Sequence, residues 1–514
     1  MNGAQSLVRT LIDCGVDTCF ANPGTSEMHF VAALDETPGI RCILGLQENV
    51  VTGMADGYYR MAGRPASTLL HCGPGLGNGL GNLHNAKRAR SGIVNIVGDH
   101  ATHHAPLDPP LAADTDALAR TMSSWVRTSR TSADVGRDAA EATAMASRLA
   151  GGVATLILPS DASWNPGGIA ARPLPVPAPP PVDPLAVETA ARALRTDGSQ
   201  VLILLGGQAV LETSQALAWR VAAHTGATVM GEFSCARVAR GRGRMQLERI
   251  PYSIPAAVEV MARFRHIVLV GSVPPVGFFA YPNQPSRLHR DDAVFHSVAR
   301  YDQNPVEALK ALVDVLDAPP VDIPDPGPRP QIATGASSPE GLAQTVAAIM
   351  PDNAIISDES VSYGRGFYPF THAAPPHDWL HLTGGAIGDG LPVATGASIA
   401  AGTDRRVISL QADGSAMYSL QSLWTQAREN LPVTTVILSN RRYNILIGEY
   451  KNVGAEPGPT AMNMLDLGRP DLDWVALANG MGVEAARADT LERCADLMKD
   501  SFSRMRPFLV ELAI

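Results

Sequence analysis

The sequence predicts an α/β protein of three domains, each built on a doubly wound parallel sheet. Its 514 residues are too many for one hydrophobic core, because domains average about 150 residues. Short apolar runs alternate with helical patterns along the whole chain, as at residues 93–97, 201–205, 267–270 and 433–438. Each run ends at glycine or a small polar residue. Such continuous apolar runs fit strands that are buried on both faces of a parallel sheet.

Two proline-rich stretches, residues 166–184 and 319–330, divide the chain. Proline fixes φ and removes a hydrogen-bond donor, so these stretches predict extended linkers rather than core elements. The predicted domains are therefore residues 1–170, 185–318 and 333–514. Functional groups in such folds gather at the carboxyl ends of the parallel strands.

The composition excludes several classes of protein. Hydrophobic residues make up 45% and charged residues 18%, which is typical of a globular protein in water. The net charge of -9 argues against nucleic acid as a partner. The six cysteines form no CxxC pair, and no apolar run of about 18 residues predicts a membrane span. With no basic, apolar leader at the start, we expect a cytoplasmic protein with reduced thiols and no membrane partner.

The third predicted domain contains a candidate metal site. Residues 406–411 predict a strand, Asp413 and Gly414 a turn, and Ser415 the start of one long helix, while Asn440 follows the next strand. A right-handed βαβ unit returns the chain parallel to itself, so Asp413 and Asn440 should meet at one sheet edge. Carboxylate and amide oxygens suit Mg²⁺, and a helix N-terminus offers free N–H groups to a diphosphate.

The first predicted domain contains a second series of polar residues. Residues 19–27 predict a strand, a turn and a helix, with Thr25 in the turn. Glu48 begins a later helix, and His71 ends a strand before a glycine-rich turn at residues 73–78. Imidazole can donate or accept a proton near neutral pH. On their own, a glutamate at a helix start is most often a surface residue and a histidine at a strand end is most often structural.

The two series together resemble thiamine diphosphate (ThDP) enzymes of the acetolactate synthase and benzoylformate decarboxylase group. The segment from Asp413-Gly414-Ser415 to Asn440 is similar to their metal-binding signature, with Ala412 in place of the first glycine. Residues 22–27, 44–58 and 69–78 are similar to their pyrimidine-binding domain, and the domain order agrees along the whole chain. The triplet Gly388-Asp389-Gly390 matches the signature letters, but no strand ending in asparagine follows at the required spacing.

The resemblance implies roles for particular residues. Glu48 would lie beside N1′ of the aminopyrimidine and promote loss of the C2 proton, and His71 and Thr25 would handle the substrate carboxylate and proton transfer. Mg²⁺ would be held by Asp413, Asn440 and the backbone carbonyl of Arg442. The residues implied to bind the cofactor are Glu48, Ser362, Gly385, Ile387, Asp413, Gly414, Ser415, Asn440 and Tyr443.

The same resemblance implies a pyrimidine-binding, a middle and a diphosphate-binding domain, with active sites between the subunits of a homodimer or homotetramer. Ile445 and Leu446 should border the substrate pocket, and Phe278 or Phe279 should approach from the middle domain. The middle-domain histidine of benzoylformate decarboxylases has no match in residues 274–281. We therefore expect an apolar pocket without charge pairing, which favours apolar 2-oxo acids over carboxylated ones.

The leading functional hypothesis is ThDP- and Mg²⁺-dependent lyase or carboligase chemistry on a 2-oxo acid, with decarboxylation and hydroxyketone formation as outcomes. FAD is not expected. One alternative is a carboligase of the acetolactate synthase large-subunit type, and another is a non-catalytic ThDP-binding paralogue. A nicotinamide dehydrogenase is a further alternative, although Gly206-Gly207 lacks the full dinucleotide glycine pattern.

Overall fold

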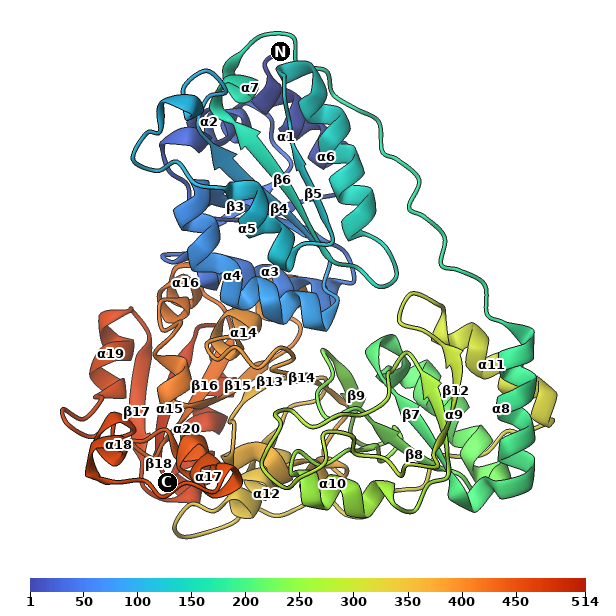
Figure 1. The fold of residues 1–514 in the computed structure, drawn as a ribbon. Helices are drawn as coiled ribbons and strands as arrows, with labels where there is room; N and C mark the ends of the chain where they lie inside the picture. Colours follow the sequence, from blue (N-terminus) through green and yellow to red (C-terminus); the bar gives the residue numbers. More distant parts are fainter.

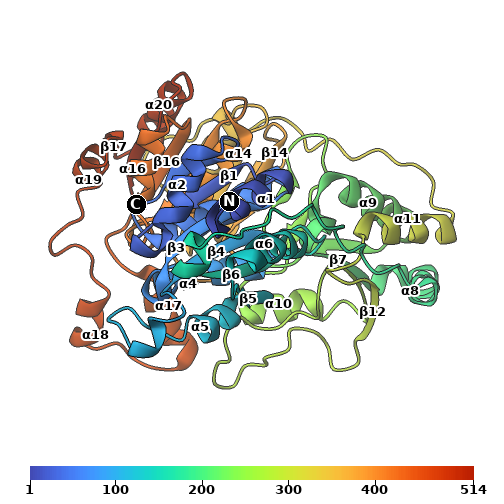
Figure 2. The ribbon, with the colours of Figure 1, turned by 90° about the horizontal axis from the view of Figure 1, so that it is seen from above.

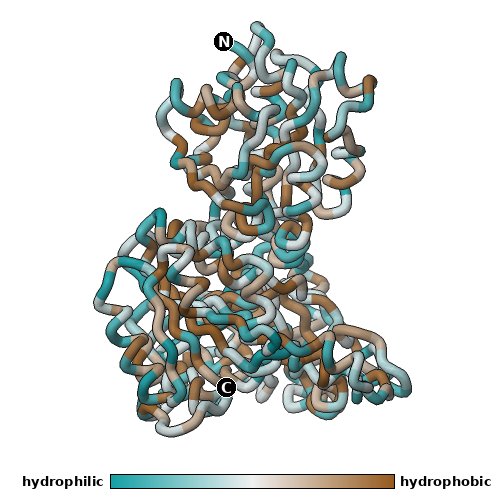
Figure 3. The backbone as a smooth tube through the Cα atoms, turned by 90° about the vertical axis from the view of Figure 1, so that its left-hand side faces the viewer, coloured by the Kyte–Doolittle hydropathy of each residue, from teal (hydrophilic) through white to brown (hydrophobic).

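The computed structural model describes residues 1–514 and contains three β-sheets, each flanked by helices (Figure 1). The predicted α/β class with three parallel-dominated sheets is confirmed. In a side view the N-terminal part of the chain forms a separate lobe above the other two parts (Figure 3). No helix combines the length and the apolar character needed to cross a bilayer.

The first sheet has six parallel strands in the order β2-β1-β3-β4-β6-β5. They are β1 (Thr18–Ala21), β2 (Arg41–Leu44), β3 (Ala66–His71), β4 (Ile93–Asp99), β5 (Trp125–Thr128) and β6 (Val153–Pro159). Its helices are α1 (Gly3–Asp13), α2 (Met28–Glu36), α3 (Glu48–Ala62), α4 (Cys72–Ala89), α5 (Thr115–Met122), α6 (Ser132–Ala146) and α7 (Ser160–Trp164). Val94 and Ile96 of β4 pack with α1 and α6, whereas Ile93 and Val97 pack with α3 and α4. Burial on both faces explains why β4 is a continuous apolar run.

The second sheet has five parallel strands in the order β10-β8-β7-β11-β12. They are β7 (Val201–Leu205), β8 (Thr228–Gly231), β10 (Glu248–Arg249), β11 (His266–Val270) and β12 (Val294–Ala299). Its helices are α8 (Pro184–Asp197), α9 (Glu212–Thr225), α10 (Ile254–Met261) and α11 (Pro305–Leu316). Seen from above, this sheet and its helices lie to one side of the other two parts (Figure 2).

The third sheet has seven strands in the order β17-β18-β16-β15-β13-β14-β9. They are β9 (Val238–Arg240), β13 (Ile355–Glu359), β14 (His377–His381), β15 (Val407–Ala412), β16 (Val433–Ser439), β17 (Glu484–Ala488) and β18 (Phe508–Ala513). Its helices are α12 (Pro339–Ile349), α13 (Tyr368–Thr371), α14 (Gly390–Ala401), α15 (Asp413–Ala416), α16 (Ser422–Arg428), α17 (Asn444–Val453), α18 (Pro459–Met464), α19 (Trp474–Gly480) and α20 (Leu491–Phe502). The six strands β13 to β18 are parallel, as predicted.

Strand β9 departs from the predicted pattern, because it lies within the middle segment of the chain but pairs antiparallel with β14 of the third sheet. The buried Arg240 anchors it, since its guanidinium donates to the carbonyls of Leu247 and Tyr368 at 3.0 and 2.7 Å. A three-residue strand inside an arginine-rich stretch gives no period for a sequence pattern to detect. The second and third sheets are therefore joined by hydrogen bonds as well as by packing.

The proline-rich stretches contain no helix or strand between α7 and α8 or between α11 and α12. The first stretch crosses from the N-terminal lobe to the middle sheet as an extended strap (Figure 1). The domain boundaries placed in these stretches stay predictions.

A buried ion pair connects the lobes where α3 packs on α14. The guanidinium of Arg60 lies 2.5 Å from a carboxylate oxygen of Asp56 and 3.5 Å from one of Asp389. It also donates to the carbonyl of His381 at 2.7 Å. Gly396 permits the close approach, because a Cβ there would lie 1.9 Å from the carbonyl oxygen of Met54. Arg60 thus contacts a carboxyl group on α3 of the N-terminal lobe and another that precedes α14 beside the third sheet.

Candidate functional site

The structure places Asp413 and Asn440 side by side at one edge of the third sheet. Strands β15 and β16 pair in parallel with Ala412 opposite Leu438, and both residues follow those strand ends. Asp413 and Asn440 line one hollow. Asp413 accepts hydrogen bonds from the N–H groups of Gly414 at 2.9 Å and Arg441 at 2.6 Å. Burial raises the pKa of Asp413, and these N–H groups oppose that shift.

The donor set at this edge fits a hard divalent cation. It offers one carboxylate and the amide oxygen of Asn440, which also accepts the N–H of Arg442 at 3.0 Å. The backbone carbonyl of Arg442, the third predicted ligand, accepts the N–H of Asn444 at 2.9 Å and retains a second lone pair. Mg²⁺ prefers such oxygen ligands and keeps phosphate oxygens or waters at its other positions.

The residues around Asp413 explain two features of the motif. Ala412 has φ -71° and ψ 141°, a conformation open to any residue, so alanine fits where the family signature has glycine. A Cβ at Gly414 would lie 2.5 Å from the ring of Tyr443, so this position has no room for a side chain. Tyr443 lines the same hollow, as does Ser415, whose hydroxyl donates to the carbonyl of Ala412 at 3.1 Å.

The single long helix predicted from Ser415 is wrong. Helix α15 covers only four residues, and α16 begins afresh at Ser422. Between them the N–H groups of Tyr418 and Ser419 bond three residues back, which breaks the helical ladder. Leu423, one of the apolar residues whose spacing suggested a single helix, is nevertheless buried in the core.

The other predicted cofactor residues of the third sheet reach the same region. Ser362 lines the hollow of Asp413, in the loop after β13, and Ile387 lines both this hollow and a larger pocket beside it. Gly385 lines the larger pocket with a φ of +79°. Val361 also lines both cavities, and its φ of +53° is rare for a β-branched residue. Such strain persists where the surroundings fix a functional loop.

The triplet Gly388-Asp389-Gly390 supports this loop from behind. The N–H groups of Gly388 and Gly390 each donate to the buried carboxylate of Glu359 at 2.7 Å. Asp389 is buried next to Arg60, and burial raises its pKa. Burial also raises the pKa of Glu359 to about 7. None of the three residues of the triplet lines the hollow formed by Asp413 and Asn440.

In the first sheet, Glu48 is the first residue of α3. Its Oε2 accepts a hydrogen bond from the side-chain amide of Asn78 at 3.1 Å, and a Cβ at Gly75 would lie 3.3 Å from its Oε1. Residues 73–78, predicted as a glycine-rich turn, are helical, because α4 begins at Cys72. The glycines of α4 thus let two helices approach around the Glu48 carboxylate.

His71, at the end of β3, has an acidic partner that the sequence did not suggest. Its Nδ1 lies 2.9 Å from Oε2 of the fully buried Glu27, which also accepts the N–H of Gly24 at 2.7 Å. Burial raises the pKa of Glu27, and the Gly24 N–H and His71 oppose that shift. A Cβ at Gly24 would lie 2.3 Å from the His71 ring, so this glycine makes room for the imidazole. Thr25, the exposed first residue of the following 3₁₀ turn, borders this pair.

These two groups of residues do not meet within one chain. The hollow around Asp413 and the pocket beside it are lined only by residues from 233 onward. Glu48, His71 and Thr25 lie in the N-terminal lobe and line neither cavity. A site that combines both groups of residues would need one of the two groups from another molecule.

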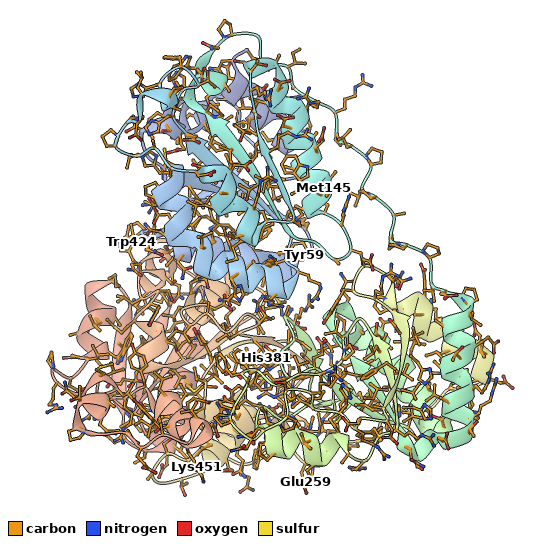
Figure 4. All side chains as sticks on the ribbon, viewed as in Figure 1. Tyr59, Met145, Glu259, His381, Trp424 and Lys451 are labelled. Atoms are coloured by element: carbon orange, nitrogen blue, oxygen red, sulfur yellow. The ribbon has the colours of Figure 1, made fainter.

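The larger pocket has a volume of about 380 Å³ and lies between the second and third sheets. Its apolar wall contains Ile445 and Leu446 from α17 and Phe278 and Phe279 from the middle segment, as predicted. His381, labelled in Figure 4, lies at the junction of these two sheets and lines the same pocket.

The expectation of a pocket without charge pairing is wrong. The guanidinium groups of Arg249 and Arg365 line it, and neither lies within 4.0 Å of a carboxylate. Local sequence patterns do not indicate this, because Arg249 lies in β10 of the middle sheet and Arg365 belongs to the loop after β13. A contact between segments so distant in sequence cannot be derived from local pattern alone.

Comparisons with known proteins agree with this arrangement. Residues 1–120 match the family model described as thiamine pyrophosphate enzyme, N-terminal TPP binding domain, and residues 362–512 match its C-terminal TPP binding domain. A Mycobacterium tuberculosis protein provisionally named acetolactate synthase large subunit IlvX is 48% identical over 517 residues, covering 100% of this chain and 99% of that protein. Benzoylformate decarboxylase of Pseudomonas aeruginosa is 29% identical, over 97% of this chain and 96% of the enzyme.

Among solved structures, the thiamine diphosphate-dependent 4-hydroxybenzoylformate decarboxylase of Rhodococcus jostii RHA1 superposes with a TM-score of 0.83. The two chains share 25% sequence identity, and the superposition covers 99% of this chain and 98% of the other. The first matched range contains Thr25, Glu48 and His71, and the second contains Ser362, Asp413 and Asn440. Neither range includes the middle sheet. Because the family models match more than half of the chain and one relative matches all of it, this protein belongs to the thiamine pyrophosphate enzymes, and it is of the same type as the acetolactate synthases and benzoylformate decarboxylases.

Proposed function

We infer that this protein is a ThDP- and Mg²⁺-dependent enzyme that decarboxylates a 2-oxo acid and can join the resulting acyl group to a second carbonyl compound. When bound, ThDP supplies a nucleophilic carbon that adds to the substrate carbonyl and accepts the electrons released with CO₂. The observation that carries the proposal is the pairing of Asp413 and Asn440 at adjacent parallel strand ends, beside a pocket large enough for a small substrate.

The residues of the third sheet would hold the diphosphate end. Asp413, Asn440 and the carbonyl of Arg442 would bind Mg²⁺, while Ser362 would donate to the diphosphate. The Gly385 carbonyl and the Ile387 side chain would contact the pyrimidine. Their shared cavity supports these assignments, because Ile387 lines both the metal hollow and the substrate pocket.

The residues of the first sheet would supply acid–base chemistry. Glu48 would share its proton with the pyrimidine nitrogen, and Asn78 would fix the orientation of its carboxyl group. His71 would exchange a proton with the substrate, held in position by Glu27, while Thr25 would bind the substrate carboxylate. Since one chain does not bring these residues to the metal hollow, a second copy would supply them, which supports a homodimer or a homotetramer.

A carboligase of the acetolactate synthase type is the second candidate, favoured by the relative that is 48% identical over the whole chain. A non-catalytic paralogue is disfavoured, because a protein that only binds the cofactor needs neither Glu48 nor the buried Glu27–His71 pair.

The test is to load the protein with ThDP and Mg²⁺ and incubate it with pyruvate, 2-oxobutyrate, benzoylformate and 2-oxoglutarate, with and without acetaldehyde. CO₂, aldehyde and hydroxyketone are measured together. We expect CO₂ from at least one 2-oxo acid, and loss of this activity in Glu48→Gln. Acetolactate as the dominant product from pyruvate would favour the carboligase, and no turnover of any 2-oxo acid would reject the proposed reaction.

A further inference from the structure

We propose that the pocket between the second and third sheets selects 2-oxo acids that carry a second anionic group at the far end of an apolar side chain, and that Arg249 and Arg365 bind this group. The inference rests on the proposed function, because it names the substrate class of that same site. It begins from the two guanidinium groups on a wall that is mostly apolar and aromatic.

Both guanidinium groups lack an anionic partner. Arg249 donates only to backbone carbonyls, that of Phe233 at 3.4 Å and that of Arg365 at 3.2 Å, and its guanidinium lies 4.6 Å from the ring centre of Tyr368. Arg365 stacks 3.9 Å above the ring of Tyr252. Stacking on a ring holds a guanidinium in place while leaving its N–H edge open to an anion.

The carboxylates of the pocket are already engaged. Asp358 accepts hydrogen bonds from the N–H of Ser360 at 3.0 Å and from the indole of Trp379 at 3.0 Å. Both oxygens of Glu359 accept backbone N–H groups, as described above. Neither carboxylate forms an ion pair with Arg249 or Arg365. The carboxylates of the pocket are therefore held by other donors, and a ligand anion that reached Arg249 and Arg365 would not have to displace a carboxylate from either guanidinium.

A row of aromatic rings separates the cofactor loop from Arg365. A Cβ at Gly385 would lie 2.5 Å from the ring of Phe278, so this ring covers the loop. The ring of Phe278 lies 5.7 Å from that of Tyr252, and Tyr252 in turn carries the guanidinium of Arg365. A substrate that reaches both the cofactor loop and Arg365 must lie along these rings. The rings would bury an apolar or aromatic body, and the arginines would meet its charged end.

A third arginine adds positive charge to the end of the pocket that contains Arg249 and Arg365. Arg240 is buried behind the pocket, 3.5 Å from the ring centre of Tyr368, and it too bonds only to uncharged oxygens. Burial lowers the pKa of His381 in the pocket wall, and the charge of Arg249 adds to that shift. The acidic group nearest in sequence, Glu248, pairs with His372 at 2.7 Å. Glu248 also interacts with the charges of Arg240 and Arg249, but it lies beyond 4.0 Å of both guanidinium groups and forms its ion pair with His372.

The experiment compares three matched substrates: benzoylformate, 4-methylbenzoylformate as a control for size, and 4-carboxybenzoylformate. The holoenzyme variants are Arg365→Gln and Arg249→Gln, with Arg263→Gln as the matched control. Arg263 is an exposed arginine that stacks on Phe264 and lies outside the pocket, so its replacement makes the same change in net charge. Arg365 is exposed, so its replacement does not disturb the core.

We expect wild-type enzyme and Arg263→Gln to prefer 4-carboxybenzoylformate over 4-methylbenzoylformate by about tenfold or more in kcat/KM, the scale of one hydrogen bond between charged groups. Arg365→Gln and Arg249→Gln should each remove about tenfold of this preference and leave benzoylformate within about twofold. Equal loss on all three substrates would overturn the proposal, because the arginines would then hold the reacting carboxylate. A wild-type preference for the methyl compound would also overturn it.

A binding measurement separates this proposal from the proposed reaction. Terephthalate and 4-methylbenzoate are titrated into ThDP- and Mg²⁺-loaded protein by calorimetry, which requires no turnover. Tighter binding of terephthalate by wild type, lost in Arg365→Gln and kept in Arg263→Gln, would support the anion site even if no 2-oxo acid were consumed. Equal affinity for both compounds would reject the site, whatever reaction the enzyme catalyses.

Discussion

Replacing Glu27 with glutamine tests whether the buried Glu27–His71 pair supports proton transfer. The carboxylate oxygen lies 2.9 Å from His71 Nδ1, and Glu27 is fully buried. An ionised carboxylate can only accept, so it requires a donor at Nδ1 and stabilises the protonated ring. The glutamine amide can present its NH₂ group instead, which reverses the tautomer. A hydrogen bond to a charged group contributes about 1.5–3 kcal/mol, so its loss should slow proton transfer by His71 about 10- to 100-fold.

The assay is the pH dependence of kcat/KM for the best 2-oxo acid. With the tautomer of His71 reversed, kcat/KM should fall about 10- to 100-fold across the pH profile. ThDP affinity should stay unchanged. Glu36→Gln, an exposed change on α2, is the control. An unchanged profile in Glu27→Gln would refute the reasoning, and a parallel loss of ThDP binding would show that Glu27 is only structural.

Other residues give predictions with different measurements. Asp413→Ala should weaken Mg²⁺-dependent ThDP binding at least about tenfold, or about 1.4 kcal/mol, in a calorimetric titration. Glu48→Gln should still bind ThDP but slow deuterium exchange at its C2 about 100-fold by NMR after acid quench. Arg60→Met leaves two buried carboxylates unpaired, so the first transition in urea should lose about 3–5 kcal/mol. Burial raises the pKa of Glu359 from 4.5 to about 7, so stability should fall as pH rises through this window, and Glu359→Gln should flatten the fall in melting temperature.

The pairing of Asp413 with Asn440 was predictable because one local rule determines it. A right-handed βαβ unit brings the ends of two parallel strands together, so Asp413 and Asn440 had to be neighbours whatever happened between them. The single helix predicted between them was wrong, but this error did not affect the predicted position of Asp413 and Asn440. The register of β15 and β16 depends on apolar pairing, not on whether α15 continues into α16.

The charged end of the pocket and the partner of His71 could not be predicted, because both depend on contacts between distant segments. Glu27 and His71 are 44 residues apart and meet only because β1 and β3 are adjacent in the first sheet. Arg249 and Arg365 are 116 residues apart and come from different sheets. A lone glutamate beside a turn is most often a surface residue, so its burial becomes evident only in three dimensions.

The architecture assigns chemistry and selectivity to different parts of the chain. The residues proposed for acid–base chemistry lie at the carboxyl ends of β1 and β3, and those proposed to hold the metal lie at the carboxyl ends of β15 and β16, so both groups follow the same rule for parallel sheets. The pocket beside that edge, by contrast, is lined by both parts of the chain, and the middle segment contributes Arg249, Tyr252 and Phe278. None of these three middle-segment residues lines the hollow of Asp413 and Asn440. Changes at these positions would therefore alter the pocket wall and leave the residues proposed to hold the metal and to transfer protons in place.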